Sequence, residues 1–116
     1  MPTENYLFSF GFENPHEARS NYLHGTDFES SRCLWVAAKD EDEASNWGQV
    51  VADKFVTWLF ETDGTADNPW AYSWSDGRFA HWIETDPEQL VVAGKLHIPA
   101  VSVGQFPNFS EVNAEG

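Results

Sequence analysis

Cysteine is almost missing from this sequence: Cys33 is the only one among 116 residues. A single cysteine cannot form an internal disulfide, and secreted domains of this size usually carry an even set. Residues 1–5 have neither a cationic start nor an apolar stretch, so we expect no signal peptide. Together these features predict a protein of the reducing cytoplasm.

Positive charge is also scarce. Six Lys and Arg stand against 19 Asp and Glu, which gives a formal net charge of −13 with histidine counted as neutral. The cations are scattered and form no basic stripe, so they could not neutralise a nucleic-acid backbone. Anionic membrane surfaces are disfavoured for the same reason. The charge therefore argues against nucleic acid and membrane as partners, and it favours either plain solubility or a basic protein partner.

The motifs of several enzyme and cofactor classes are missing as well. The four histidines form no His-x-x-x-His pair, and one cysteine cannot build a zinc ribbon, so we expect no metal site. The glycines form no phosphate-binding loop, and there is no Gly-x-Ser-x-Gly elbow. No apolar run is long enough to cross a membrane. We therefore expect no cofactor, and the sequence favours a binding role over an enzymatic one.

Aromatic residues, by contrast, are abundant: nine Phe, six Trp and three Tyr make 16% of the chain. Residues 5–12 alternate strictly, with one face formed by Tyr6, Phe8, Phe10 and Phe12. This pattern predicts a half-buried strand with an aromatic inner face. Residues 32–38 form an apolar run of strand length without alternation, which predicts a strand in the middle of the sheet.

Two helices are expected next to these strands. A capping box at Asn14–Glu17 indicates a short helix over about residues 15–23. Asp40 is the expected N-cap of a longer helix over about residues 41–61, and Gly64 is placed to end it. Its apolar positions recur at helical spacing, at Ala44, Trp47, Val51, Phe55, Trp58 and Leu59. We expect this amphipathic helix to pack on the sheet.

The dipeptide Asp76-Gly77 is the strongest short hairpin signal in the chain. If it is the two-residue turn, the expected cross-strand pairs are Ser75 with Arg78, Trp74 with Phe79, Tyr72 with His81, and Trp70 with Ile83. One face of the hairpin would then be an aromatic slab that meets the long helix. Further on, residues 90–93 and 96–103 are short apolar pieces broken by glycine and proline, and at least one is expected to be an edge strand.

These elements predict a single α+β domain over residues 1–116. Its core would be a mainly antiparallel or mixed sheet of four to five strands with one long amphipathic helix (about 41–61) packed on one face. Residues 113–116 are expected to form a frayed tail.

The first candidate site is on the predicted aromatic slab. His81 and Tyr72, flanked by Trp74 and Trp70, combine aromatic walls with polar groups, as ligand sites often do. A core histidine bonded to Tyr72 or to the backbone explains the same pattern.

The second candidate site is an interface on the opposite face of the sheet. Trp82 falls on that face, and if the face is open, exposed Trp82 and Trp35 would mark a contact surface.

Three functions are compatible with these features. The leading hypothesis is an interaction domain that binds a basic protein, because immunity proteins and inhibitors of cationic toxins are similar in size, charge and compartment. It predicts an acidic patch with exposed aromatic residues at its centre. The alternative is a small-ligand or enzymatic domain that uses the face around His81 and Tyr72. A third function is a homodimer through the free sheet face or an edge strand.

Overall fold

The structure is a computed structural model that describes residues 2–77 and 79–114. Within these residues four strands form one mixed sheet in the order β3-β1-β2-β4. In chain order the strands are β1 (Glu4–Phe12), β2 (Ser30–Ala38), β3 (His81–Glu84) and β4 (Ala100–Ser102). β1 is antiparallel to β2 and β3, and β4 is parallel to β2. The predicted α+β class and the mixed sheet, with β2 in its interior, are confirmed.

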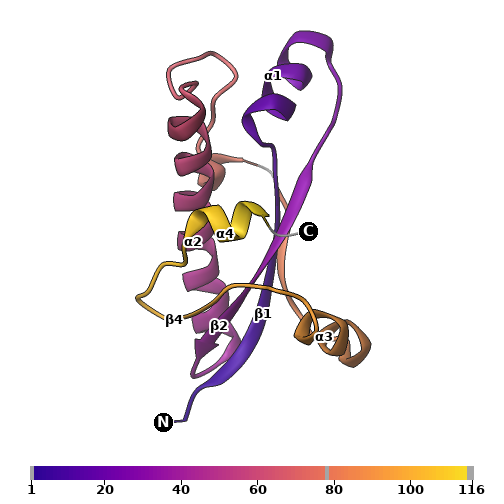
Figure 1. The fold of residues 1–116 in the computed structure, drawn as a ribbon, viewed down its shortest axis with the longest axis vertical. Helices are drawn as coiled ribbons and strands as arrows, with labels where there is room; N and C mark the ends of the chain where they lie inside the picture. The colour runs from indigo at the N-terminus through magenta and orange to yellow at the C-terminus, as the bar shows by residue number, and fades with distance from the viewer. Residues whose placement is uncertain (1, 78, 115–116) are drawn as a thin grey trace.

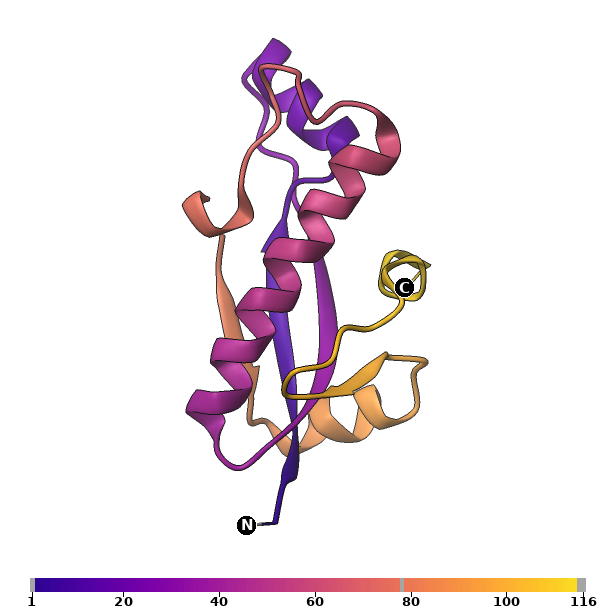
Figure 2. The ribbon, with the colours of Figure 1, turned by 90° about the vertical axis from the view of Figure 1, so that its left-hand side faces the viewer.

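The long helix α2 (Glu41–Asp63) lies along one face of the sheet, as predicted (Figure 1; Figure 2). It begins after Asp40, whose Oδ1 accepts a hydrogen bond from Glu43 N at 2.8 Å. It ends at Gly64, where a φ of 75° suits a residue without a Cβ. The side chains that α2 turns toward the sheet are buried, among them those of Val51 and Phe55.

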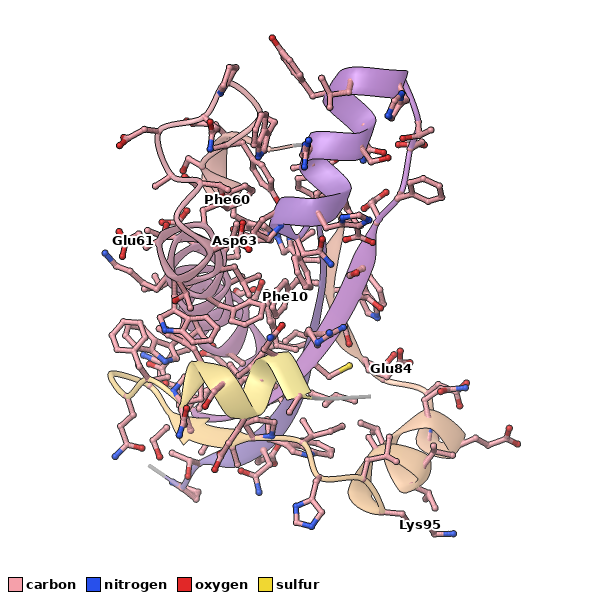
Figure 3. The ribbon with its side chains drawn as sticks, turned by 45° about the horizontal axis from the view of Figure 1, so that its top comes forward. Phe10, Phe60, Glu61, Asp63, Glu84 and Lys95 are labelled. Carbon is pink, nitrogen blue, oxygen red and sulfur yellow. The ribbon has the colours of Figure 1, made fainter. Side chains whose placement is uncertain are left out.

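α2 approaches β1 closely at Gly48. A Cβ added there would lie only 2.4 Å from Cγ of Phe8, so the helix rests on this ring. Next along β1, the rings of Phe10 and Phe12 follow with centroids 5.7 Å apart, and Phe55 of α2 meets both edge-on. Figure 3 shows Phe10 between the helix and the strands. The core is therefore an aromatic row on β1 covered by α2.

The α1 end of the molecule connects β1 to β2 (Figure 1). α1 (Pro15–His24) starts with the predicted capping box, in which Glu17 N donates to Asn14 Oδ1 at 2.8 Å and Asn14 N donates to Glu17 Oε1 at 3.0 Å. The loop after α1 is held by Asn21, whose side chain bonds both the N–H and the C=O of Phe28 at 2.9 Å. This loop is therefore tied to its own helix.

The predicted hairpin about Asp76-Gly77 is wrong. Trp74–Asp76 form a single 3₁₀ turn (η1), and Gly77 has a φ of −77°, which does not fit the expected hairpin turn. The indole N–H of Trp74 donates to Gly11 O at 2.9 Å, and its ring meets Phe10 edge-on. Oδ1 of Asp53 on α2 accepts from Ser75 N at 3.3 Å. These contacts with β1 and α2 override the local turn signal.

The strand after the turn pairs with β1 instead of a preceding strand. His81 lies opposite Phe10 and Ile83 opposite Phe8. The predicted pairs Trp74 with Phe79, Tyr72 with His81, and Trp70 with Ile83 are therefore wrong, because residues 70–75 form no strand. Arg78, the predicted partner of Ser75, lies outside the described residues.

The remaining elements are two short helices and an edge strand. α3 (Pro87–Gly94) lies on the opposite side of the strands from α2, and it includes residues 90–93 (Figure 1). β4 is the edge strand predicted within residues 96–103. α4 (Phe109–Ala114) packs Phe109 against Phe55 and Trp58 of α2. Of the expected tail, residues 113–114 end α4, and residues 115–116 lie outside the described part of the chain.

Replacing Gly48 with alanine tests the close approach of α2 to β1. We expect a loss of about 2 kcal/mol in the free energy of unfolding, because overpacking costs up to about 3 kcal/mol and the gain in helix propensity is only about 1 kcal/mol. Urea unfolding measures the change. Gly94 is the matched control, since it is also helical and an added Cβ there meets nothing within 4 Å. Equal losses in Gly48→Ala and Gly94→Ala would contradict the packing explanation.

Candidate functional site: an acidic groove beside α1

An open groove of about 800 Å³ lies between the α1 end of the molecule and a wall formed from residues 69–77 and 79. We call it the α1 groove. One wall comes from α1 and from the loop at residues 26–29, and the other from the chain that follows α2. The volume is within the range of ligand sites in proteins.

Aromatic rings form much of the α1 groove. They are those of Tyr22 on α1 and of Trp70, Tyr72 and Phe79 on the opposite wall. Tyr72 and Phe79 have ring centroids 5.3 Å apart, and Tyr72 also meets Phe60 of α2 edge-on at 5.4 Å. Tyr22 is 61% exposed, so the groove opens to solvent on the α1 side. The opposite wall is anchored to α2 through Tyr72 and Phe60, while Tyr22 on the α1 side faces solvent.

Carboxylates surround these rings. Four acidic residues line the α1 groove: Glu13, Asp27, Glu29 and Asp76. Its described lining residues include no lysine, arginine or histidine. The Glu13 carboxylate accepts a hydrogen bond from Asn21 Nδ2. Oε1 of Glu29 lies 3.0 Å from the point where a Cβ of Gly11 would stand, so the glycine leaves room for this carboxylate at the end of β1. The charged residues in the described lining of the groove are therefore all acidic.

Tyr72 joins the two parts of the chain that form the bottom of the groove. Its hydroxyl accepts from Glu13 N at 2.7 Å and donates to Glu13 O at 2.8 Å. Burial raises the pKa of Tyr72 above its ordinary value of 10.0, and the negative charges of Glu13, Glu17 and Glu29 raise it further. The protonated Tyr72 hydroxyl therefore holds this wall of the groove to the residue that follows β1.

The four predicted ligand-binding residues are divided between two grooves. Trp70 and Tyr72 line the α1 groove, whereas Trp74 and His81 line a smaller groove of about 300 Å³ beside α2. The rings of Trp74 and His81 have centroids 5.7 Å apart, but Trp74 is buried and His81 is exposed. Phe79 lines both grooves and separates the two pairs.

The two predicted interface tryptophans share the sheet face opposite α2. Trp82 lies opposite Ser9 and is 46% exposed, and Trp35 lies opposite Leu7 and is half-buried. The indole N–H of Trp82 donates to Glu84 Oε2 at 3.2 Å.

The α1 side of the groove was missed by sequence reasoning. Tyr22 and Glu29 reach the same groove as Trp70 only because the chain folds back after α2. No motif connects these positions, since they come from segments that are far apart in the sequence.

Comparison with protein-family models, curated proteins and solved structures gave no match. None of the described helices is both long and apolar enough to cross a membrane. In the described part of the chain, no three His, Cys, Asp or Glu side chains are grouped as ligands for a metal ion.

The raised pKa of Tyr72 predicts a pH-dependent stability. Below pH 10.0, its ordinary pKa, the folded and unfolded states both carry the proton, and the contribution of Tyr72 to stability is complete. As the pH rises above that value the unfolded state loses the proton first, so the folded state is progressively destabilised. We expect Tyr72→Phe to reduce this alkaline loss of stability.

Two measurements check the Tyr72 prediction. Urea unfolding at increasing alkaline pH should show a steeper fall for the wild type than for Tyr72→Phe. Tyrosinate absorbance of the folded wild type and variant should differ by one tyrosine whose pKa is above the ordinary value. If the tyrosine missing from the variant ionised at the ordinary pKa of 10.0, the burial of Tyr72 would be contradicted.

Proposed function

We propose that this chain is an acidic interaction domain that binds a basic protein partner in the cytoplasm, with the α1 groove as its anchor site. The observation that carries the proposal is the composition of this groove: aromatic walls and four carboxylates, with no cation among its described lining residues. A net charge of −13 adds a long-range field of the same sign. Such a field attracts and orients a basic partner before contact.

The surface around the groove also exposes large apolar side chains, which an interface needs. Tyr22, Leu23 and Phe28 are 61%, 53% and 55% exposed, and all three belong to α1 or its loop. Aromatic side chains that become buried on binding carry much of the energy of many interfaces. The α1 end therefore offers apolar contact area beside an electronegative groove, which is the arrangement expected of an inhibitor- or immunity-like domain.

The net charge makes a homodimer a weaker proposal than a complex with a basic partner. A homodimer through the face bearing Trp82 and Trp35 would bring two copies of a −13 chain together. Like charges repel, so such a dimer would have to overcome a cost that a basic partner avoids. The single cysteine agrees with a reducing cytoplasm as the place of the interaction.

A small-ligand or enzymatic function is the second candidate. The observation that favours it is the smaller groove, where the His81 ring contacts Trp74 and Asp53 is another lining residue. Native mass spectrometry of the protein purified from its own cells would show a retained small molecule, and His81→Ala would release it without unfolding the chain. A protein that carries no such molecule would count against this function.

A cationic peptide tests the proposed function directly. The probe is a labelled, unstructured peptide in which arginine and lysine alternate with glycine and serine, and its Kd is measured by fluorescence anisotropy. Raising the salt from about 0.05 M to about 0.5 M should weaken binding at least about tenfold, because screening shortens the reach of the charges. A peptide with glutamate in place of the cations should not bind.

Matched charge variants locate the binding site. Asp27→Asn combined with Glu29→Gln should weaken binding of the cationic peptide about fivefold or more, because both carboxylates line the groove. Glu41→Gln combined with Asp42→Asn removes the same charge at the start of α2, at the other end of a molecule 47 Å long. Equal losses in both double variants would show a nonspecific charge effect and overturn the assignment to the α1 groove.

A further inference from the structure

Trp70 already pairs with a guanidinium group in the free protein. Cζ of Arg19, on α1, lies 5.9 Å from the centroid of the Trp70 ring. Arg19 does not line the α1 groove, whereas Trp70 does. Trp70 therefore both contacts a guanidinium and lines the groove. The intramolecular contact shows which chemistry this ring accepts.

The other walls of the groove suit a flat cation with hydrogen-bond donors at its edges. Planar rings of Tyr22 and Phe79 lie in the same groove as Trp70. The carboxylates of Asp27 and Glu29 make no hydrogen bonds to other described residues, and Asn21 holds the loop between them. A guanidinium can stack on a ring and bond a carboxylate through its edge at the same time, whereas an ammonium is a compact and strongly hydrated charge.

We propose that the α1 groove is an arginine subsite, in which an arginine side chain of the basic partner inserts between the Trp70 wall and the Asp27–Glu29 loop. This inference rests on the proposed function and specifies the partner's contact residue. The groove of about 800 Å³ is larger than one side chain, so the residues on either side of the arginine also fit. The loop carrying the carboxylates is held by Asn21 before the partner arrives, which lowers the entropy lost on binding.

Two peptides of equal length and charge test the arginine subsite. In one every cation is arginine, in the other every cation is lysine, and glycine and serine separate them in both. The wild type should bind the arginine peptide about fivefold more tightly than the lysine peptide. Trp70→Leu should remove this preference. Trp82→Leu is the matched control, because Trp82 is also partly exposed but lies on the sheet face opposite α2.

A second variant and an NMR measurement test the subsite even if Trp70→Leu fails to fold. Tyr22 is 61% exposed, so Tyr22→Ala should lower the arginine preference without disturbing the core. In the wild type, the indole N–H of Trp70 is buried and has no acceptor among the described residues. Its NMR cross-peak, one of six from tryptophan, should shift with the arginine peptide more than that of Trp82.

The outcomes separate this inference from the proposed function. Equal binding of both peptides, or an arginine preference that survives Trp70→Leu, would overturn the subsite and leave a basic partner in place. A preference lost in Trp82→Leu but kept in Trp70→Leu would place the arginine on the other face and also overturn it. Failure of both peptides to bind the wild type would overturn the proposed function itself.

Discussion

The contact between Gly48 and Phe8 sets the distance between α2 and β1, and the rest of the fold depends on that distance. With no side chain at Gly48, the helix lies directly on the Phe8 ring, and Phe55 can reach the rings of Phe10 and Phe12. An aromatic row of this kind buries much apolar area and also favours edge-on ring pairs. The direction of α2 along the sheet then decides where the chain emerges at Gly64, beside α1 at one end of the molecule (Figure 1).

The α1 groove is a consequence of how the chain returns from that point to the sheet. Trp74 fits against Phe10 and bonds Gly11 O, which fixes the chain just before β3 at the edge of α2. Tyr72 bonds the backbone of Glu13 and fixes the same segment at the end of β1. Tyr72 lines the α1 groove and Trp74 follows two residues later, so these anchors hold the wall opposite α1 in place. Its position is thus determined by core packing, and its chemistry by the side chains that happen to face it.

The sequence predicted the elements whose signals are local. The capping box at Asn14, the N-cap at Asp40 and the aromatic inner face of β1 have the predicted structure, because each depends on hydrogen bonds or burial within a few residues. The prediction that β1 is half-buried is wrong, since Leu7 and Ser9 on its other face are buried as well. The hairpin failed since the Asp76-Gly77 signal competes with the contacts of Trp74 and Asp53, which come from residues far along the chain. The predicted site around His81 and Tyr72 is split between two grooves for the same reason, because Trp70 and His81 share a face only if the hairpin forms.

Some carboxylates have hydrogen-bond partners within the described fold, and others on several parts of the surface have none. Those of Glu17 and Asp53 bond the backbone or side chains of their own fold, as does the cap at Asp40. Asp27 and Glu29 bond no other described residue, yet they lie beside aromatic rings. Folding does not require these charges, and their mutual repulsion opposes the compact state. Solubility alone would be served by carboxylates anywhere on the surface, whereas binding a cation requires them next to the groove.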